Sequence, residues 1–237
     1  MKTRTLIAAA AFAGVAGQAI AAEPVKPWKG EAELGVVSTG GNTETTNVKA
    51  RAGVVYEVEK WRHTARIDAL NTSDKVRTTA ERYLASWKSD YKFDEFNYMF
   101  GLISYENDRF AGFDYRVSEA IGYGRRLINR PTLTLDTEIG PGARQTKLKT
   151  GESENELISR LAGNLAWKIS DTATFTENLS TEIGKNATIT RSVTALTAQL
   201  VGTLAMKLSF TARHISDVPV DREKLDTETA VTLVYGF

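Results

Sequence analysis

The feature that most constrains this chain is a regular alternation of apolar and polar side chains that recurs to its last residue. In residues 47–59, one face of an extended strand carries only apolar or aromatic side chains: Val48, Ala50, Ala52, Val54, Tyr56 and Val58. Residues 61–69, 82–93 and 228–237 repeat the pattern. Side chains alternate with period two along a strand, whereas an amphipathic helix needs an apolar stripe of period 3.6, and no sustained stripe occurs. The sequence therefore predicts an all-β protein.

Turn residues divide the alternating segments into about twelve strands. The expected strands cover residues 30–39, 43–59, 61–72, 80–93, 96–106, 115–127, 132–145, 154–169, 172–184, 190–206, 208–216 and 226–237. Tight and longer connections alternate along the chain. The tight ones are Glu59-Lys60, Asp94-Glu95, 129–131, Ser170-Asp171 and Met206-Lys207, and the longer polar ones are 73–79, 107–114, 146–153, 185–189 and 217–225. Gly40-Gly41-Asn42 is an exception, since it is a tight turn where a longer loop is expected.

This alternation of connections favours a transmembrane barrel, which has short turns at one end and longer loops at the other. Closure of the sheet satisfies every backbone hydrogen bond inside a bilayer. Aromatic residues gather near the expected short-turn end, as an interfacial girdle would place them. They are Trp28, Trp61, Tyr91, Phe93, Phe96, Tyr98, Trp167, Tyr235 and Phe237. We expect a single antiparallel transmembrane β-barrel of about twelve strands, and a soluble sandwich or a soluble periplasmic β-barrel that binds a ligand remains the alternative.

The N-terminal residues indicate the compartment. Lys2 and Arg4 precede an apolar run that ends in the small residues Ala21 and Ala22, as in a secretory signal peptide. We expect a cleaved signal peptide over residues 1–22, a short periplasmic segment over 23–29 and the barrel over 30–237. The chain has no cysteine for a disulfide or a thiolate site, and 30 basic against 29 acidic residues leave no positive surface for nucleic acid. The predicted location is the outer membrane of a Gram-negative bacterium, reached through the periplasm.

Several motifs resemble those of a known family, the domain of unknown function 481, also called putative salt-induced outer-membrane proteins. They include Trp28-Lys29-Gly30, residues 39–43 (TGGNT), residues 122–126 (GYGRR) and residues 138–144 (EIGPGAR). The resemblance implies an outer-membrane barrel and a link to salt or osmotic stress. Tyr235 and Phe237 look like the C-terminal signal by which the outer-membrane assembly machinery recognises barrels. Expected partners are that machinery, outer-membrane lipid and lipopolysaccharide.

The side chains expected to face the lumen carry charges of both signs. The candidate lumen-lining residues are Lys49, Arg51, Arg66, Asp68, Arg82, Lys88, Asp136, Glu138, Arg144 and Arg160. Further charged residues share this parity: Arg62, Asp90, Arg116, Glu156, Lys168, Glu182, Arg213 and Glu228. Charges that pair across the lumen would plug it, and charges on opposite walls would leave a narrow pore for ions or small solutes. A twelve-stranded barrel lies between filled eight-stranded barrels and wide porins, so both alternatives stay open.

An enzyme is the competing class of protein. His214 and Ser216 fall at i and i+2, on one face of the expected strand 208–216, where a histidine could activate a serine of a lipid hydrolase. The spacing alone is common in strands, and no metal-ligand or cofactor motif accompanies it. We expect a non-enzymatic protein without metal or cofactor.

Overall fold

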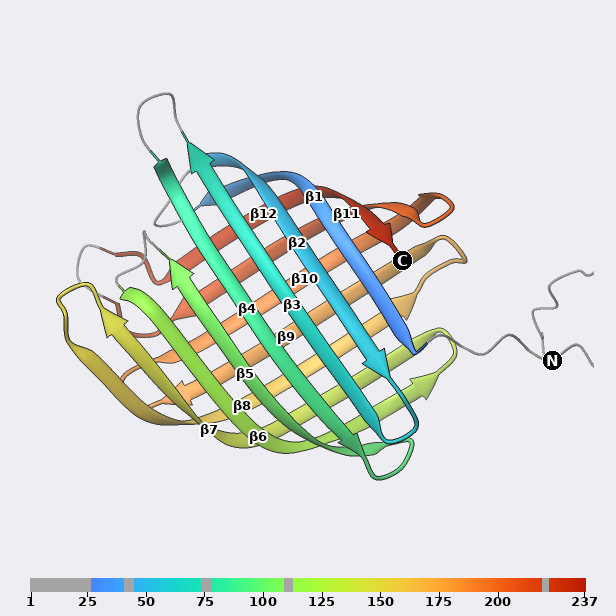
Figure 1. Cartoon of the computed structure of the whole chain (residues 1–237), viewed down its shortest axis with the longest axis horizontal. Helices are drawn as coiled ribbons and strands as arrows, with labels where there is room; N and C mark the ends of the chain where they lie inside the picture. The colour runs from blue at the N-terminus through green and yellow to red at the C-terminus, as the bar shows by residue number, and fades with distance from the viewer. Residues whose placement is uncertain (1–26, 41–44, 74–77, 109–112, 219–221) are drawn as a thin grey trace, which may run out of the picture.

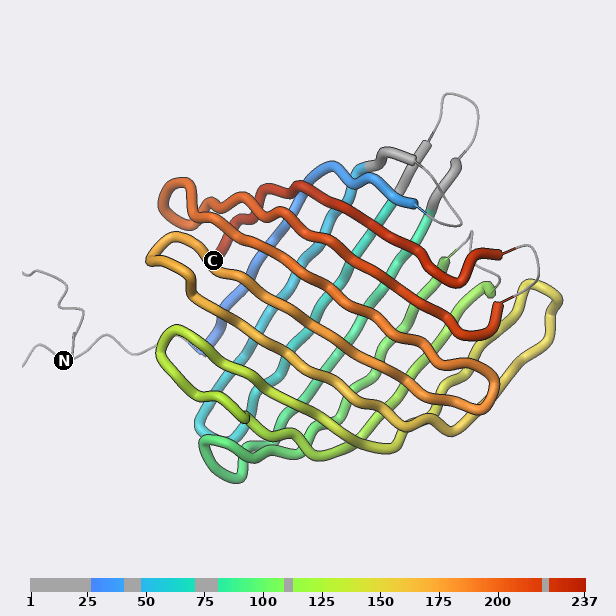
Figure 2. Tube along the Cα trace, turned by 180° about the vertical axis from the view of Figure 1, so that it is seen from behind, coloured from blue at the N-terminus to red at the C-terminus, as the bar shows by residue number. Residues whose placement is uncertain are grey.

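The computed structural model describes residues 27–40, 45–73, 78–108, 113–218 and 222–237. Twelve strands form one antiparallel sheet that closes on itself in chain order (Figures 1 and 2). They are β1 (Trp28–Gly40), β2 (Thr45–Glu57), β3 (Trp61–Ser73), β4 (Thr78–Lys92), β5 (Asn97–Asp108), β6 (Phe113–Arg130), β7 (Leu133–Leu148), β8 (Ser153–Lys168), β9 (Ala173–Gly184), β10 (Thr188–Val201), β11 (Leu204–Ile215) and β12 (Leu225–Gly236). No helix in these described ranges is long and apolar enough to cross a bilayer. The prediction of a twelve-stranded antiparallel barrel is confirmed.

The barrel closes where the first and last strands meet. β1 and β12 pair from Glu31 opposite Gly236 to Gly40 opposite Thr227, and Gly30 and Phe237 exchange two backbone hydrogen bonds of 2.8 and 2.9 Å. Both described chain ends therefore lie at one end of the barrel (Figure 1), together with the turns after β2, β4, β6, β8 and β10. We call this the short-turn end and the opposite one the loop end.

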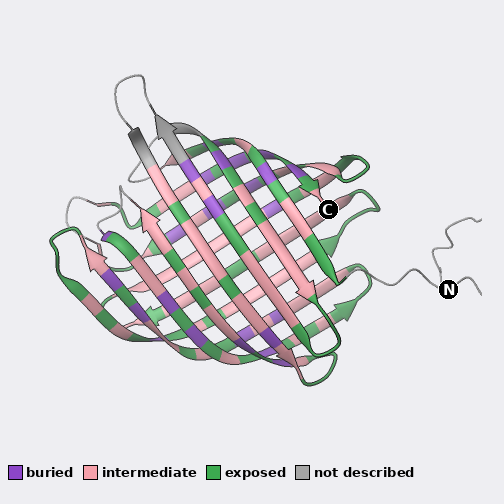
Figure 3. Cartoon of the chain, in the orientation of Figure 1, coloured by how far each residue is buried: buried purple, intermediate pink, exposed green. Residues whose placement is uncertain are grey.

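Burial follows the predicted alternation along the strands (Figure 3). In β12, Val231 and Leu233 are half exposed on the outer face, whereas Glu228 and Thr232 are almost fully buried inside. The same parity holds in β2, where Val48 faces out and Lys49 faces in. An apolar outer face and a polar interior are the reverse of a soluble barrel packed around an apolar core, and they suit a sheet surrounded by lipid.

The connections differ from those expected. The turn predicted at Met206-Lys207 is wrong, because the chain turns at residues 202–203, where Gly202 has a φ of +56° that suits a glycine. The strands also run further toward the loop end than expected. The connections at 149–152 and 185–187 are therefore short, and only the one at 216–224 remains long among those that the structure describes in part or whole. Gly41 and Asn42, the signal peptide and residues 23–26 lie outside the described residues, and β1 begins at Trp28, two residues before the predicted start of the barrel.

The aromatic residues form two belts rather than one. Trp28, Trp61, Phe93, Phe96, Trp167, Tyr235 and Phe237 are exposed near the short-turn end, as predicted. Tyr83, Tyr105 and Tyr115 add an exposed group toward the loop end, and Tyr105 and Tyr115 stack at 6.2 Å. Tyr98 was predicted to belong to the girdle, but only 4% of it is exposed, because β5 turns Tyr98, Phe100 and Leu102 inward.

Deleting Phe237 is expected to slow barrel closure and lower the yield of folded protein. The deletion removes the two backbone bonds to Gly30 and the ring that covers this glycine. The folded fraction can be followed during refolding by the heat-dependent shift of the barrel on a gel. Phe237→Leu keeps both bonds and serves as the control. If Phe237→Leu refolds in detergent as poorly as the deletion, loss of the backbone seam is not the cause.

Candidate functional site: the barrel lumen

The ten candidate lumen residues all point into the barrel. Six line one large cavity: Arg51, Arg66, Asp68, Arg82, Arg144 and Arg160. The other four lie in largely buried ion pairs between strands: Lys49 with Glu228, Lys88 with Glu138, and Asp136 with Arg126. The structure thus brings the ten side chains together inside the barrel. Their role in transport stays a prediction.

The cavity has a volume of about 1030 Å³ and follows the barrel axis. Its lining begins near the short-turn end at Thr174 and reaches Asp217 and Glu223 in the last loop. Its two walls differ. The wall formed by β9 to β12 is rich in uncharged polar side chains, among them Thr174, Thr176, Asn178, Ser180, Thr197, Ser209 and Thr211. The opposite wall, from β2 to β8, carries most of the charged side chains.

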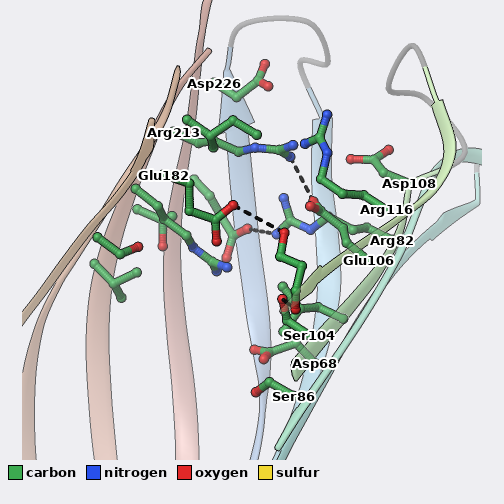
Figure 4. A pocket seen from close by; sticks show the side chains of 18 of the residues that line it. Asp68, Arg82, Ser86, Ser104, Glu106, Asp108, Arg116, Glu182, Arg213 and Asp226 are labelled. Atoms are coloured by element: carbon green, nitrogen blue, oxygen red, sulfur yellow. Dashed lines mark hydrogen bonds and ion pairs between the residues drawn. The ribbon is translucent and has the colours of Figure 1, made fainter. Parts of the chain in front are cut away.

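Four arginines from four strands lie near one another in the loop-end half of the cavity, and we call Arg82, Arg116, Arg191 and Arg213 the central arginine cluster. Figure 4 labels three of them, Arg82, Arg116 and Arg213. Arg213 donates to Glu106 at 2.8 Å. Arg82 donates to Glu228 at 2.5 Å, and Glu228 also pairs with Lys49. The carboxylates that face the cluster therefore bind it across the lumen, since β5 and β11 lie on different parts of the barrel wall.

The central arginine cluster has more donors than these carboxylates satisfy. Arg116 Nη1 and Arg213 Nη2 are buried without a hydrogen-bond partner among the described residues. Arg116 rests on the Phe113 ring, with its guanidinium carbon 4.1 Å from the ring centre. The Arg191 side chain makes no direct ion pair or hydrogen bond within the described part of the chain, although Asp68 and Glu106 lie near it. Such N–H groups favour an anion that passes between them.

Arg144 ties three strands together toward the loop end. It is 1% exposed and donates to Glu156 at 2.9 and 2.7 Å, to Glu182 at 3.4 Å and to the Ala187 carbonyl. Glu156 also accepts a bond from the backbone N–H of Asn186 at 2.8 Å. These contacts join β7, β8 and β9 to the 185–187 turn. Arg144 therefore holds one side of the cavity in place.

A second charged group fills part of the lumen near the short-turn end, and we call it the Tyr98 cluster. It consists of Arg62, Lys88, Asp90, Tyr98, Arg126, Asp136 and Glu138. Tyr98 donates to Glu138 at 2.9 Å and lies 5.3 Å from the Arg62 guanidinium and 5.2 Å from the Lys88 ammonium. Asp90, 1% exposed, accepts from Arg62 at 2.7 Å. None of these side chains lines the large cavity, so the cavity passes beside the cluster.

Two members of the central region, Glu106 and Arg191, were not predicted. In the segment that contains Glu106, apolar residues occur at both parities, because β5 packs Phe100 and Leu102 inside and exposes Met99 and Ile103 outside. Arg191 follows Thr188 and Thr190, and a threonine gives no strong signal for either face. The neighbouring Thr190 and Ser192 face outward, so Arg191 faces the lumen. The charge of Arg191 was the signal from which the sequence could have predicted this.

The proposed His214 and Ser216 pair does not form. β11 ends at Ile215, so Ser216 lies beyond the strand, where its Oγ accepts a 2.9 Å bond from the backbone N–H of Thr188. His214 is exposed on the outer face, and no hydrogen bond joins it to Ser216 in the described residues. Nor do the described residues contain three His, Cys, Asp or Glu side chains placed to hold a metal ion.

The closed sheet, the apolar outer face and the polar lumen define an outer-membrane β-barrel. The chain belongs to the family described as "Protein of unknown function, DUF481", whose model matches residues 32–237. This confirms the resemblance seen in the sequence. The "Uncharacterized protein YdiY" of Escherichia coli (strain K12) is 28% identical over 212 residues, which are 89% of this chain and 84% of that protein.

Solved structures of outer-membrane barrels share the fold. The NanC porin superposes with a TM-score of 0.59 at 11% identity, and the match covers 86% of this chain and 98% of the NanC chain. The translocator domain of the autotransporter NalP from Neisseria meningitidis gives 0.55 at 12% identity over 91% and 90%. The COG4313 outer membrane channel from Pseudomonas putida F1 gives 0.53 at 10% identity over 94% and 100%. At these identities the comparisons show the fold, and the lumen must indicate the function.

Proposed function

We propose that this protein is a narrow, non-enzymatic outer-membrane channel for small polar solutes and ions, with a preference for anions. The observation that carries the proposal is the cavity, whose wall of β9 to β12 is rich in uncharged polar side chains although it also carries Arg191, Arg213 and Glu228. Ion pairs bind the two walls to each other across the lumen and leave this volume open. The NanC porin and the COG4313 outer membrane channel share this fold, which supports a channel of this architecture.

The anion preference follows from the central arginine cluster. Charges in a narrow, low-dielectric passage act strongly on a passing ion. Arg116 and Arg213 each keep a donor without a described partner, and these donors are available to an anion but not to a cation. The paired charges resist rearrangement, so the passage stays narrow.

Other expectations accompany this proposal. The protein reaches the outer membrane of a Gram-negative cell through the periplasm after losing residues 1–22, and Tyr235 and Phe237 present the last strand to the assembly machinery. Phospholipid and lipopolysaccharide surround the apolar face, and no cofactor takes part. His214 and Ser216 have no catalytic role, because Ser216 stabilises the connection to Thr188 instead. The link to salt or osmotic stress rests on the family resemblance alone.

Conductance of the refolded protein, Glu23 to Phe237, in a planar bilayer tests the channel. We expect discrete current steps and a reversal potential in a KCl gradient that indicates a preference for chloride. Arg213→Gln is expected to weaken this preference, whereas Glu106→Gln is expected to strengthen it, because the two residues form one ion pair of opposite charges. The two shifts have opposite signs, so a general loosening of the barrel cannot produce both.

Lys60→Gln is the control, because this lysine lies in the exposed turn between β2 and β3 and not in the cavity. It removes one positive charge and is expected to leave selectivity unchanged. The heat-dependent gel shift first verifies that each variant is folded. A folded but silent barrel would mean that the lumen is plugged and its role structural, and unaltered selectivity in both lumen variants would place the conducting path elsewhere.

A further inference from the structure

The outer face of β6 to β9 departs from the apolar surface that lipid requires. In the described strands between the aromatic belts, the charged side chains that face outward are Glu119 and Arg125 on β6 and Glu177 on β9. Glu177 faces out because its neighbours Thr176 and Asn178 line the cavity. By contrast, the outward side chains of β11, β12 and β1 include Leu208, Phe210, Val231, Leu233, Leu34 and Val36.

Glu177 lies inside the apolar belt. Its ladder partner on β8 is Leu165, which lies on the same outer face as Trp167 of the girdle but two residues closer to the loop end. The Glu177 carboxylate accepts hydrogen bonds from Ser192 at 2.7 Å and Thr194 at 2.5 Å on β10. These hydroxyl donors lower the free-energy cost of placing the carboxylate in lipid, but they bring no positive charge. A charged side chain on the lipid face of a barrel is unfavourable, so it points to a partner other than lipid tails.

A groove runs beside Glu177 on the same outer face. It has a volume of about 580 Å³ and lies over β7 and β8, where Thr137 and Gly163 form a cross-strand pair. A side chain added at Gly163 would meet nothing within 4 Å. Arg125 lines the groove on the β6 side, and its guanidinium forms no ion pair in the described part of the chain. Small residues of this kind let two membrane surfaces approach closely.

Arg125 and Glu177 lie on opposite sides of this groove. The strands follow one another in the order β6, β7, β8, β9, and the ladder connects Arg125, Thr137, Gly163 and Leu179. Such a row climbs toward the loop end from β6 to β9 because the strands are tilted. Glu177 is two residues closer to the short-turn end than Leu179, which offsets about half of this climb. The remaining difference in level between the two opposite charges is within the reach of the long Arg125 side chain.

We propose that this face binds a second copy of the chain. A twofold axis along the barrel axis, through the Thr137 and Gly163 groove, places Arg125 of one protomer against Glu177 of the other in two equivalent ion pairs. A twofold interface must be self-complementary, and a positive and a negative charge at equal distances from its centre meet this condition. This interface lies on the outer surface and is independent of whether the lumen conducts.

Cysteine cross-linking tests the interface, because the chain has no cysteine of its own. Gly163→Cys, placed at the axis, is expected to form a covalent dimer on mild oxidation in outer-membrane vesicles. Gly101→Cys is the matched control, since this glycine lies on β5, and a side chain there also meets nothing within 4 Å. It is expected to stay monomeric. Equal cross-linking of both variants, or none in a folded Gly163→Cys barrel, would overturn the proposal.

Charge reversal identifies the ion pairs. In the Gly163→Cys background, Arg125→Glu or Glu177→Arg alone is expected to reduce the dimer yield about tenfold, as loss of a close interfacial charge pair does. The double exchange, Arg125→Glu with Glu177→Arg, is expected to restore it. A double variant as defective as the single ones would overturn the proposal, and a monomer that carries bound phospholipid would assign the groove to a lipid instead.

Discussion

Replacing Gly140 by valine is expected to abolish the folded barrel. Gly140 on β7 and Gly122 on β6 approach so closely that a Cβ on Gly140 overlaps the Ile121 carbonyl oxygen and lies 2.6 Å from the Gly122 Cα. These are backbone atoms, so no side chain can rotate away. Adding methyl groups to a well-packed core costs about 1–3 kcal/mol. Here the two strands must separate, which also breaks ladder hydrogen bonds, and we expect the heat-resistant band to fall to background.

Gly101→Val is the control for Gly140→Val. Both changes add the same side chain to a glycine in the middle of a strand, but the one at Gly101 has free space. We expect this control to fold with wild-type yield and to keep the heat-dependent gel shift. If Gly140→Val folds equally well, the close approach of β6 and β7 is not required for assembly.

Arg144→Met is expected to cost about 3–5 kcal/mol of unfolding free energy, because it leaves buried carboxylates without their main partner. Glu156 loses two hydrogen bonds from the guanidinium, and Glu182 loses an ion pair of 3.4 Å. The aliphatic methionine keeps much of the volume, so the lost charge dominates the effect. Urea unfolding in lipid vesicles, followed by tryptophan fluorescence, measures the change.

Two further variants separate the charge effect from a packing effect. Arg144→Met with Glu156→Gln removes one of the stranded carboxylates and is expected to recover part of the lost stability. Lys92→Met breaks a 3.0 Å pair with the exposed Glu57 and is expected to cost only about 0–1 kcal/mol, as surface pairs do. A loss in Lys92→Met as large as that in Arg144→Met would contradict the assigned role of burial.

The sequence predicts the fold well because one physical cause acts on every strand. Lipid on one side and water or polar groups on the other impose period two, so Val48 and Lys49, or Val231 and Thr232, reveal their faces without knowledge of their partners. The pattern fails where the interior is itself apolar. β5 is the example, since Phe100 and Met99 face opposite sides although both are apolar.

The arrangement of the lumen could be predicted only in part, because parity says which side chains enter the barrel but not which of them meet. Arg213 pairs with Glu106 across the barrel, 107 positions away in the chain, and only the closed sheet brings them together. Tyr98 shows the same limit, since its bond to Glu138 depends on how β5 and β7 face each other through the lumen. The turn at residues 202–203 was missed for a local reason, since Met206-Lys207 continues the alternation of β11.

The seam between β1 and β12 makes folding of this protein an all-or-none event. Every other strand pairs with a neighbour that is close in the chain, but Leu34 must find Leu233 at the opposite terminus. Contacts of such high sequence separation form late and slowly. A nascent chain that lacks its last strand therefore has two unpaired edges, which are sites of aggregation, and does not close as a smaller barrel. Quality control of this protein consequently depends on completion of β12, the twelve residues from Leu225 to Gly236.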